Sequence, residues 1–147
     1  MSKQEQAINY HIEGYNCSQA VLGVFAEELG LDKEVAMKLA SAFGGGMRCG
    51  NVCGAVTGAM MAFGLKEGQA IGEDQETKAK MNAYAVEIQR RFKEKHETIL
   101  CKELLPYDIT TPEGMEQIKA ENLSRTRCDQ LIADAVASVE DMLEAMS

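Results

Sequence analysis

The chain is poor in several residue types that mark common functions. It contains no tryptophan, two prolines and two histidines, and aromatic residues make up 5% of its 147 residues. The histidines, His11 and His96, lie far apart without metal-ligand spacing, so we expect a structural or solvated role for each. Basic residues number 15 against 23 acidic ones, which gives a net charge of −8. An acidic chain without a basic cluster predicts no nucleic-acid partner, because phosphate backbones need a basic face.

Long apolar runs are also absent. No uninterrupted stretch of about 18 apolar residues occurs, so we expect no transmembrane helix and no membrane insertion. The polar start, Met1-Ser2-Lys3-Gln4, lacks the apolar segment of a secretory signal and predicts that nothing was removed before Met1. A cytoplasmic location follows as the expectation. Unpaired cysteines in that compartment serve redox chemistry or metal binding more often than structural disulfides.

Strand patterns are scarce and helical periodicity dominates. Few Val, Ile or Thr runs alternate with polar residues, and no Asn-Gly or Asp-Gly hairpin turn occurs. We therefore predict an all-α fold, a compact helical bundle of about six or seven helices in a single domain over residues 1–147. The expected helices cover residues 3–12, 17–29, a segment capped by Asp32, 52–65, 74–97, a short turn at 101–105, 112–122 and 127–146.

The same periodicity predicts which residues face the core. In the first helix these are Ala7 and Ile8, with Ile12 as a further candidate, and in the helix after Asp32 they include Val35 and Leu39. The 52–65 helix is apolar almost all round, which predicts a central, buried position.

What the chain does have is five cysteines, four of which are expected to open helices. These are Cys17, Cys53, Cys101 and Cys128. A thiol in the first helical turn faces unpaired backbone N–H groups and the positive end of the helix dipole, which favour the thiolate. Thiolates attack disulfides, bind soft metals and ligate iron–sulfur clusters. The alternative is that these cysteines are small buried hydrophobic residues.

The cysteine spacing contains none of the local signatures of known sites. There is no C-x-x-C, which argues against a thioredoxin-type pair or a zinc knuckle, and no C-x-x-C-H haem attachment motif. Because alternate helix starts of a bundle project from one end, the four helix-opening cysteines are expected to converge, either in one pocket or as two pairs. Arg48 would add positive charge to such a pocket.

A glycine-rich loop precedes the central helix. Residues 44–51, GGGMRCGN, hold four glycines in seven positions, which permits left-handed backbone and close approach by other groups. Gly54 and Gly58 then lie on one helix face. Tight helix packing is the simpler interpretation for Gly58, and access to the sulfur is as plausible at Gly54. Both glycines, with Arg48, are candidate cofactor-contacting residues.

Three blocks, residues 14–17 (GYNC), 42–47 (AFGGGM) and 53–58 (CGAVTG), are followed by two late cysteines. Together they resemble the C-GCAxxG-C-C family of redox-active proteins. The resemblance implies a small helical domain whose functional set is Cys17, Cys53, Cys101 and Cys128, and a relative of this domain is associated with an iron–sulfur centre. The family label writes Gly-Cys-Ala where this chain reads Cys-Gly-Ala. Cys49 is not one of the family's four cysteines.

Four functions stay open at this point. The first is a redox protein that exchanges thiols and disulfides, with Cys53 as the expected nucleophile. The second is an electron carrier in which the four family cysteines ligate an iron–sulfur cluster. Structural zinc and a helical protein-interaction module with structural cysteines are the others. A redox protein is the expected partner, and an apolar stripe left on the 74–97 helix would make a homodimer reasonable.

Overall fold

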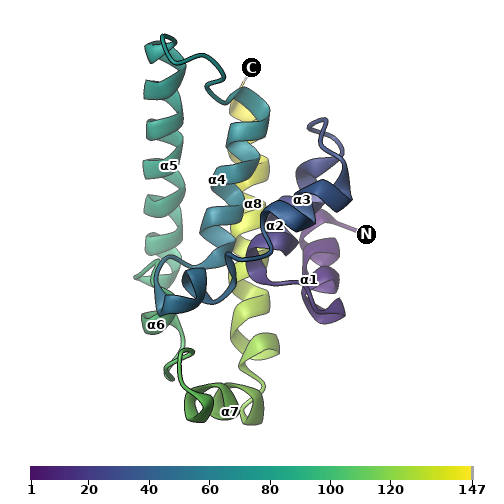
Figure 1. Cartoon of the computed structure of the whole chain (residues 1–147), viewed down its shortest axis with the longest axis vertical. Coiled ribbons are helices and arrows are strands. Elements are labelled where there is room, and N and C mark those ends of the chain that lie inside the picture. Colours follow the sequence, from purple (N-terminus) through teal and green to yellow (C-terminus); the bar gives the residue numbers. More distant parts are fainter. Residues whose placement is uncertain (147) are drawn as a thin grey trace.

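A computed structural model describes residues 1–146, which form helices joined by short loops (Figure 1). Within that range the backbone contains no strand, only an isolated antiparallel bridge between Val52 and Leu100, so the predicted all-α fold is confirmed. The elements are α1 (Lys3–Glu13), α2 (Cys17–Ala26), α3 (Lys33–Leu39), η1 (Gly46–Gly50), α4 (Gly54–Glu67), α5 (Gln75–His96), α6 (Cys101–Leu104), α7 (Pro112–Ala120), η2 (Ser124–Cys128) and α8 (Asp129–Ala145).

Local capping explains why the N-terminal helices begin where they do. Ser2 accepts a hydrogen bond from the backbone N–H of Glu5 at 3.1 Å, and the Glu5 side chain returns to Ser2, which forms a capping box. Asn16 and Gln19 form the same arrangement at the start of α2. Asp32 caps α3, as predicted. These caps fix the first residue of each helix, and in α2 that residue is Cys17.

The core is centred on α4, which packs against α2, α5 and α8. In Figure 1, α4, α5 and α8 run along the length of the molecule, α1 to α3 lie on one side and α7 lies at one end. The predicted central position of the 52–65 helix is therefore confirmed. Of the helices between Lys3 and Ala145, none combines the length and the apolar character needed to cross a membrane.

The predicted core face of α3 is wrong in phase, and in α1 Ala7 is buried as predicted but the further candidate Ile12 is not. Ile12 is 57% exposed, and on α3 Val35 is exposed and Leu39 is 60% exposed. The buried face of α3 instead carries Ala36 and Ala40, which pack with residues of α2. Small side chains let α3 lie close to α2, so the larger aliphatic residues are left on the solvent side. The pattern alone assigned the larger residues to the core.

Candidate functional site

The four helix-opening cysteines line one cavity of about 190 Å³. Cys17 is the first residue of α2, Cys53 is the N-cap of α4, Cys101 is the first residue of α6, and Cys128 directly precedes α8. The structure thus gathers in one place the four cysteines that the helix-start argument brought together. The chemistry that each cysteine can perform depends on the groups around its thiol.

A short backbone pairing places Cys53 beside Cys101. The N–H of Cys53 donates to the carbonyl of Ile99 at 2.7 Å, and the N–H of Cys101 donates to the carbonyl of Asn51, also at 2.7 Å. These bonds flank the bridge between residues 52 and 100. The end of the glycine-rich loop is therefore fastened to the start of α6, and two cysteines 48 positions apart face the same cavity.

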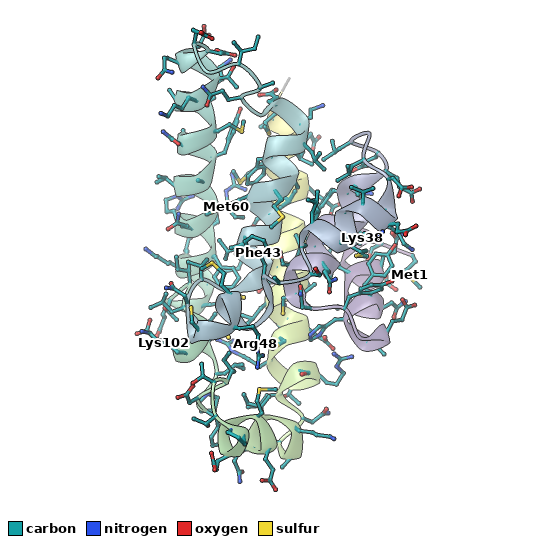
Figure 2. The ribbon with its side chains drawn as sticks, in the orientation of Figure 1. Met1, Lys38, Phe43, Arg48, Met60 and Lys102 are labelled. Atoms are coloured by element: carbon teal, nitrogen blue, oxygen red, sulfur yellow. The ribbon has the colours of Figure 1, made fainter. Side chains whose placement is uncertain are left out.

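The glycine-rich loop forms one wall of the cavity. Met47 and Arg48 have φ values of 61° and 59°, and a side chain on Gly46 would lie 2.4 Å from the carbonyl oxygen of Asn51. This left-handed path turns Arg48 toward the cavity, where its Nη2 donates to the carbonyl of Ile109 at 3.4 Å (Figure 2). The predicted positive charge near the cysteines is therefore present.

Cys17, the first residue of α2, and Cys128, the last residue of η2, line the cavity together, and the Cys17 thiol acts on the pKa of Cys128 as a hydrogen-bond donor. The hydrogen bond from the Cys17 thiol lowers the pKa of Cys128. Burial and the Asp129 carboxylate raise this pKa, whereas the guanidinium groups of Arg125 and Arg127 lower it further. The same bond, together with burial and the other three sulfurs, raises the pKa of Cys17 well above its ordinary value. Within the pair, Cys128 is the group favoured as a thiolate and Cys17 is the group that keeps its proton.

Unlike that of Cys128, the pKa values of Cys53 and Cys101 are raised, so both thiols keep their protons. Burial raises the pKa of Cys53 to about 12, although the backbone N–H groups of Ala55 and Val56 oppose the shift. Burial likewise raises the pKa of Cys101 to about 11, against the positive charge of Arg48. The helix N-terminus is therefore too weak to offset desolvation at Cys53. Burial therefore opposes the thiolate that the helix position was expected to favour at Cys53, the expected nucleophile.

His11 is a neighbour of the cysteine pair that the sequence did not single out. Its Nε2 lies 4.0 Å from the Sγ of Cys17, and its Nδ1 lies 2.9 Å from Asp129 Oδ1 and 2.7 Å from Arg125 Nη2. His11 lines the cavity rather than projecting into solvent. No local pattern could reveal this, because Asp129 is 118 positions away in the sequence.

The remaining predicted site residues lie in different places. Cys49 is exposed, lies outside the wall of the cysteine cavity, and donates from Sγ to the carbonyl of Gly46 at 3.3 Å. Gly54 lines the cavity, where a Cβ would come within 3.2 Å of the Cys17 Cβ. Gly58 lies one turn further along, outside that wall, and packs against α2. Close helix packing therefore accounts for Gly58.

Replacement of Gly58 by alanine tests this packing. The added Cβ would lie 2.7 Å from the carbonyl oxygen of Ser18, so Gly58→Ala should lower the free energy of unfolding by about 1–3 kcal/mol. Gly64→Ala, on the same helix, is the matched control. Its Cβ would meet no heavy atom of residues 1–146 within 4 Å, so it should raise stability by about 0.5–1 kcal/mol. Urea unfolding of both variants measures the contrast, and equal effects would contradict it.

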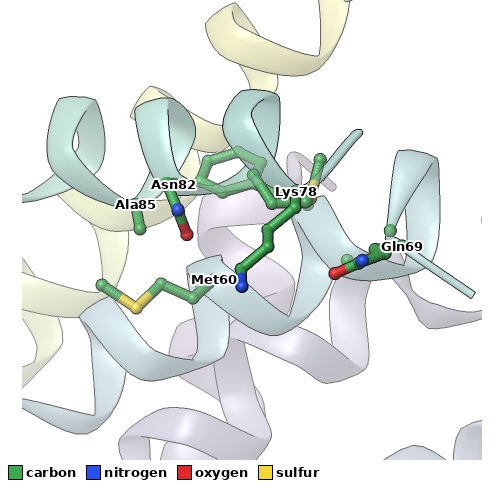
Figure 3. A pocket seen from close by; sticks show the side chains of 9 residues that line it. Met60, Gln69, Lys78, Asn82 and Ala85 are labelled. Atoms are coloured by element: carbon green, nitrogen blue, oxygen red, sulfur yellow. The ribbon is translucent and has the colours of Figure 1, made fainter. Parts of the chain in front are cut away.

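Several cavities are larger than this one; one of about 450 Å³ is lined by the exposed Cys49 but by none of the four helix-opening cysteines, and the two largest have no cysteine in their walls. One, of about 520 Å³, lies between α4 and α5, where Met60, Lys78 and Asn82 line it (Figure 3). Another, of about 780 Å³, lies beside the end of α5 and includes His96 and Arg127. No cysteine lines either cavity, so the candidate site for sulfur chemistry is the cavity of about 190 Å³.

Four thiols around one cavity are the kind of donor set that an iron–sulfur cluster uses. Across the part of the chain that the structure describes, no group of three or more histidine, cysteine, aspartate or glutamate side chains is arranged to hold a metal ion. The described side chains are therefore not arranged as a site for a single metal ion.

The fold and the cavity define a small all-α protein built around four inward-facing cysteines. A family model described as "Putative redox-active protein (C_GCAxxG_C_C)" matches residues 15–142. The chain therefore belongs to this family, as the sequence resemblance predicted. A search of curated proteins and a search of solved structures found no match. The matched segment includes all four cavity cysteines and Asp129, whereas His11 precedes it.

Proposed function

We propose that the protein exchanges thiols and disulfides through Cys17 and Cys128. The observation that carries the proposal is that these two side chains line one small cavity, where the nearby guanidinium groups of Arg125 and Arg127 favour the Cys128 thiolate. A working dithiol needs one sulfur that is readily ionised and a second sulfur within reach. Cys128 supplies the first and Cys17 supplies the second.

The reaction balances with a disulfide, R–S–S–R′, as the oxidant. The Cys128 thiolate attacks one of its sulfurs, a Cys128–S–S–R bond forms, and R′ leaves as a thiolate. Cys17 then loses its proton and attacks the Cys128 sulfur, which forms the Cys17–Cys128 disulfide and releases R as a thiolate. The two protein thiols lose two electrons, the partner disulfide gains them, and the two released protons end on the departing thiolates. The reverse sequence reduces the protein.

The other two cavity cysteines have a different place in this proposal. Cys53 is buried, and its raised pKa keeps it protonated at neutral pH. Cys101 is buried and packs with Leu105, Ile109 and Ile118. Both are expected to remain thiols while the pair turns over, and their bulk helps exclude water from the pair.

Disulfide mapping tests the proposal. Reduced protein treated with a small excess of oxidised glutathione should form one intramolecular disulfide per chain, between Cys17 and Cys128. Peptide mass spectrometry after alkylation of the remaining thiols locates the bond. A Cys49→Ser background removes the exposed thiol, which would otherwise react without regard to the cavity. A bond between Cys53 and Cys101, or the absence of any intramolecular bond, would overturn the proposal.

The four-cysteine iron–sulfur centre is the second candidate, and the observation that favours it is that all four sulfurs line one cavity. On the thiol proposal, protein purified without oxygen is colourless and holds no stoichiometric iron or sulfide. A brown protein with iron and acid-labile sulfide, lost on replacement of any one of the four cysteines by serine, would favour the cluster instead.

A further inference from the structure

The end of α1 places the imidazole ring of His11 beside the cysteine pair. His11 lies in the last turn of α1, and α1 packs against both α2 and α8. Its Nε2 is 4.0 Å from the Sγ of Cys17, within the range of a hydrogen bond to sulfur. The charged and titratable side chains in contact with the ring are Cys17 from α2, Asp129 from α8 and Arg125 from η2.

Asp129 and Arg125 both contact Nδ1 of His11, and only the tautomer that Asp129 favours leaves Nε2 free to act on sulfur. The carboxylate lies 2.9 Å from Nδ1, the distance of a charge-assisted N–H···O bond, and so favours the tautomer with hydrogen on Nδ1. The lone pair of Nε2 then faces Cys17. Arg125 opposes this tautomer through its Nη2, 2.7 Å from Nδ1, but its Nε is ion-paired with Asp129 Oδ2 at 3.2 Å. The carboxylate therefore contacts both the ring and the guanidinium.

Cys17 needs a proton acceptor in the second half of the exchange. It attacks only as a thiolate, yet burial and the sulfurs of Cys53 and Cys101 still raise its pKa after Cys128 has entered the mixed disulfide. Water has limited access to a half-buried thiol at the wall of a small cavity. An imidazole whose free nitrogen faces the sulfur meets this need, in the same arrangement of nucleophile, base and orienting carboxylate that activates other thiols.

We infer that His11 is the base that takes the proton from Cys17 and that Asp129 is the positioning residue that orients the ring, an inference that rests on the proposed Cys17–Cys128 exchange. As the Cys17 sulfur attacks Cys128, its proton moves to His11 Nε2, and the ring becomes an imidazolium next to the Asp129 carboxylate. The imidazolium then gives the proton to solvent or to the departing thiolate R–S⁻. No further reactant is required.

A two-phase kinetic experiment tests the inference. In the Cys49→Ser background, a chromogenic aromatic disulfide releases one coloured thiolate when Cys128 reacts and a second when Cys17 resolves the mixed disulfide. In His11→Gln the first phase should change less than about twofold, and the second should slow by about a hundredfold. The residual second phase should rise about tenfold per pH unit, because hydroxide then removes the proton.

Asp129→Asn gives a readout that a merely structural role would not produce. Loss of the carboxylate removes a charge that raises the pKa of Cys128, so the first phase should not slow. The second phase should slow, by about tenfold or more, because the amide can donate to Nδ1 and favour the wrong tautomer. Loosened packing would change both phases in the same direction.

His96→Gln is the matched control, because His96 also contacts an aspartate, Asp134, at 2.8 Å but does not line the cysteine cavity. Because His96 also contacts Arg127, which favours the Cys128 thiolate, any change should fall on the first phase, and the second phase should match that of the background protein. A second phase in His11→Gln within about twofold of the background would overturn the role of His11 and leave the exchange proposal standing. Absence of a second phase in the background protein itself would overturn the exchange proposal, and with it this inference.

Discussion

Cys128→Ser is expected to slow the reaction of the reduced protein with a disulfide at pH 7 by at least about a thousandfold, the order lost when a nucleophile is removed. The other cavity thiols cannot replace it. A thiol with a pKa of about 12, such as Cys53, is ionised to about one part in 10⁵ at this pH. Cys17 keeps its proton as well, since removal of Cys128 leaves its burial unchanged.

The measurement is a stopped-flow trace in the Cys49→Ser background, with Cys53→Ser as the control. The control should keep the rate of the background protein within a few-fold, because a buried, protonated thiol takes no part in the first attack. Cys17→Ser should still react once and then stop at the mixed disulfide. Loss of the reaction in Cys53→Ser, with the rate of Cys128→Ser preserved, would reverse the assignment of the nucleophile.

Phe63→Ala should produce the largest loss of stability, about 3–5 kcal/mol. Phe63 is 1% exposed on α4, belongs to the main core cluster, and lies 5.9 Å from the ring of Tyr84 on α5. Truncation removes the ring that joins these two helices and leaves a cavity. Urea unfolding followed by circular dichroism measures the change.

Val86→Ala is the control for this core substitution. Val86 is on α5 but 66% exposed, so its truncation should change the free energy of unfolding by less than about 0.5 kcal/mol. If the two variants were equally stable, α5 would not be held to the rest of the bundle through Phe63.

Features fixed by neighbouring residues could be predicted from the sequence. The caps at Asn16 and Asp32 act within three residues, so the starts of α2 and α3 follow from local chemistry. The exposed positions of Val35 and Leu39 could not be predicted, because they depend on how closely α3 approaches α2. Periodicity gives a helix face, and the neighbouring helix determines which part of that face is covered.

The candidate site, like the fold, could be predicted from the sequence only in part. The places of the four cysteines at helix starts could be predicted, and one pocket was one of the two arrangements that those places allowed; the long-range pairing of residues 52 and 100 brings Cys53 to Cys101. The proposed division into a reactive pair and two protonated thiols depends on burial, which the position of Cys53 at a helix start does not reveal. The contact of His11 with Asp129 requires α1 to dock on α8, and no spacing in the sequence encodes that docking.

The positions of Cys17 and Cys128 at opposite ends of the chain have a mechanical consequence. A bond between them would tie α2 to α8 and close a ring that includes most of the polypeptide, so unfolding would release far less chain entropy. Such a cross-link typically adds about 2–4 kcal/mol of stability. The oxidised form would then be more stable and more resistant to proteases than the reduced form. Reduction of the disulfide would remove this added stability.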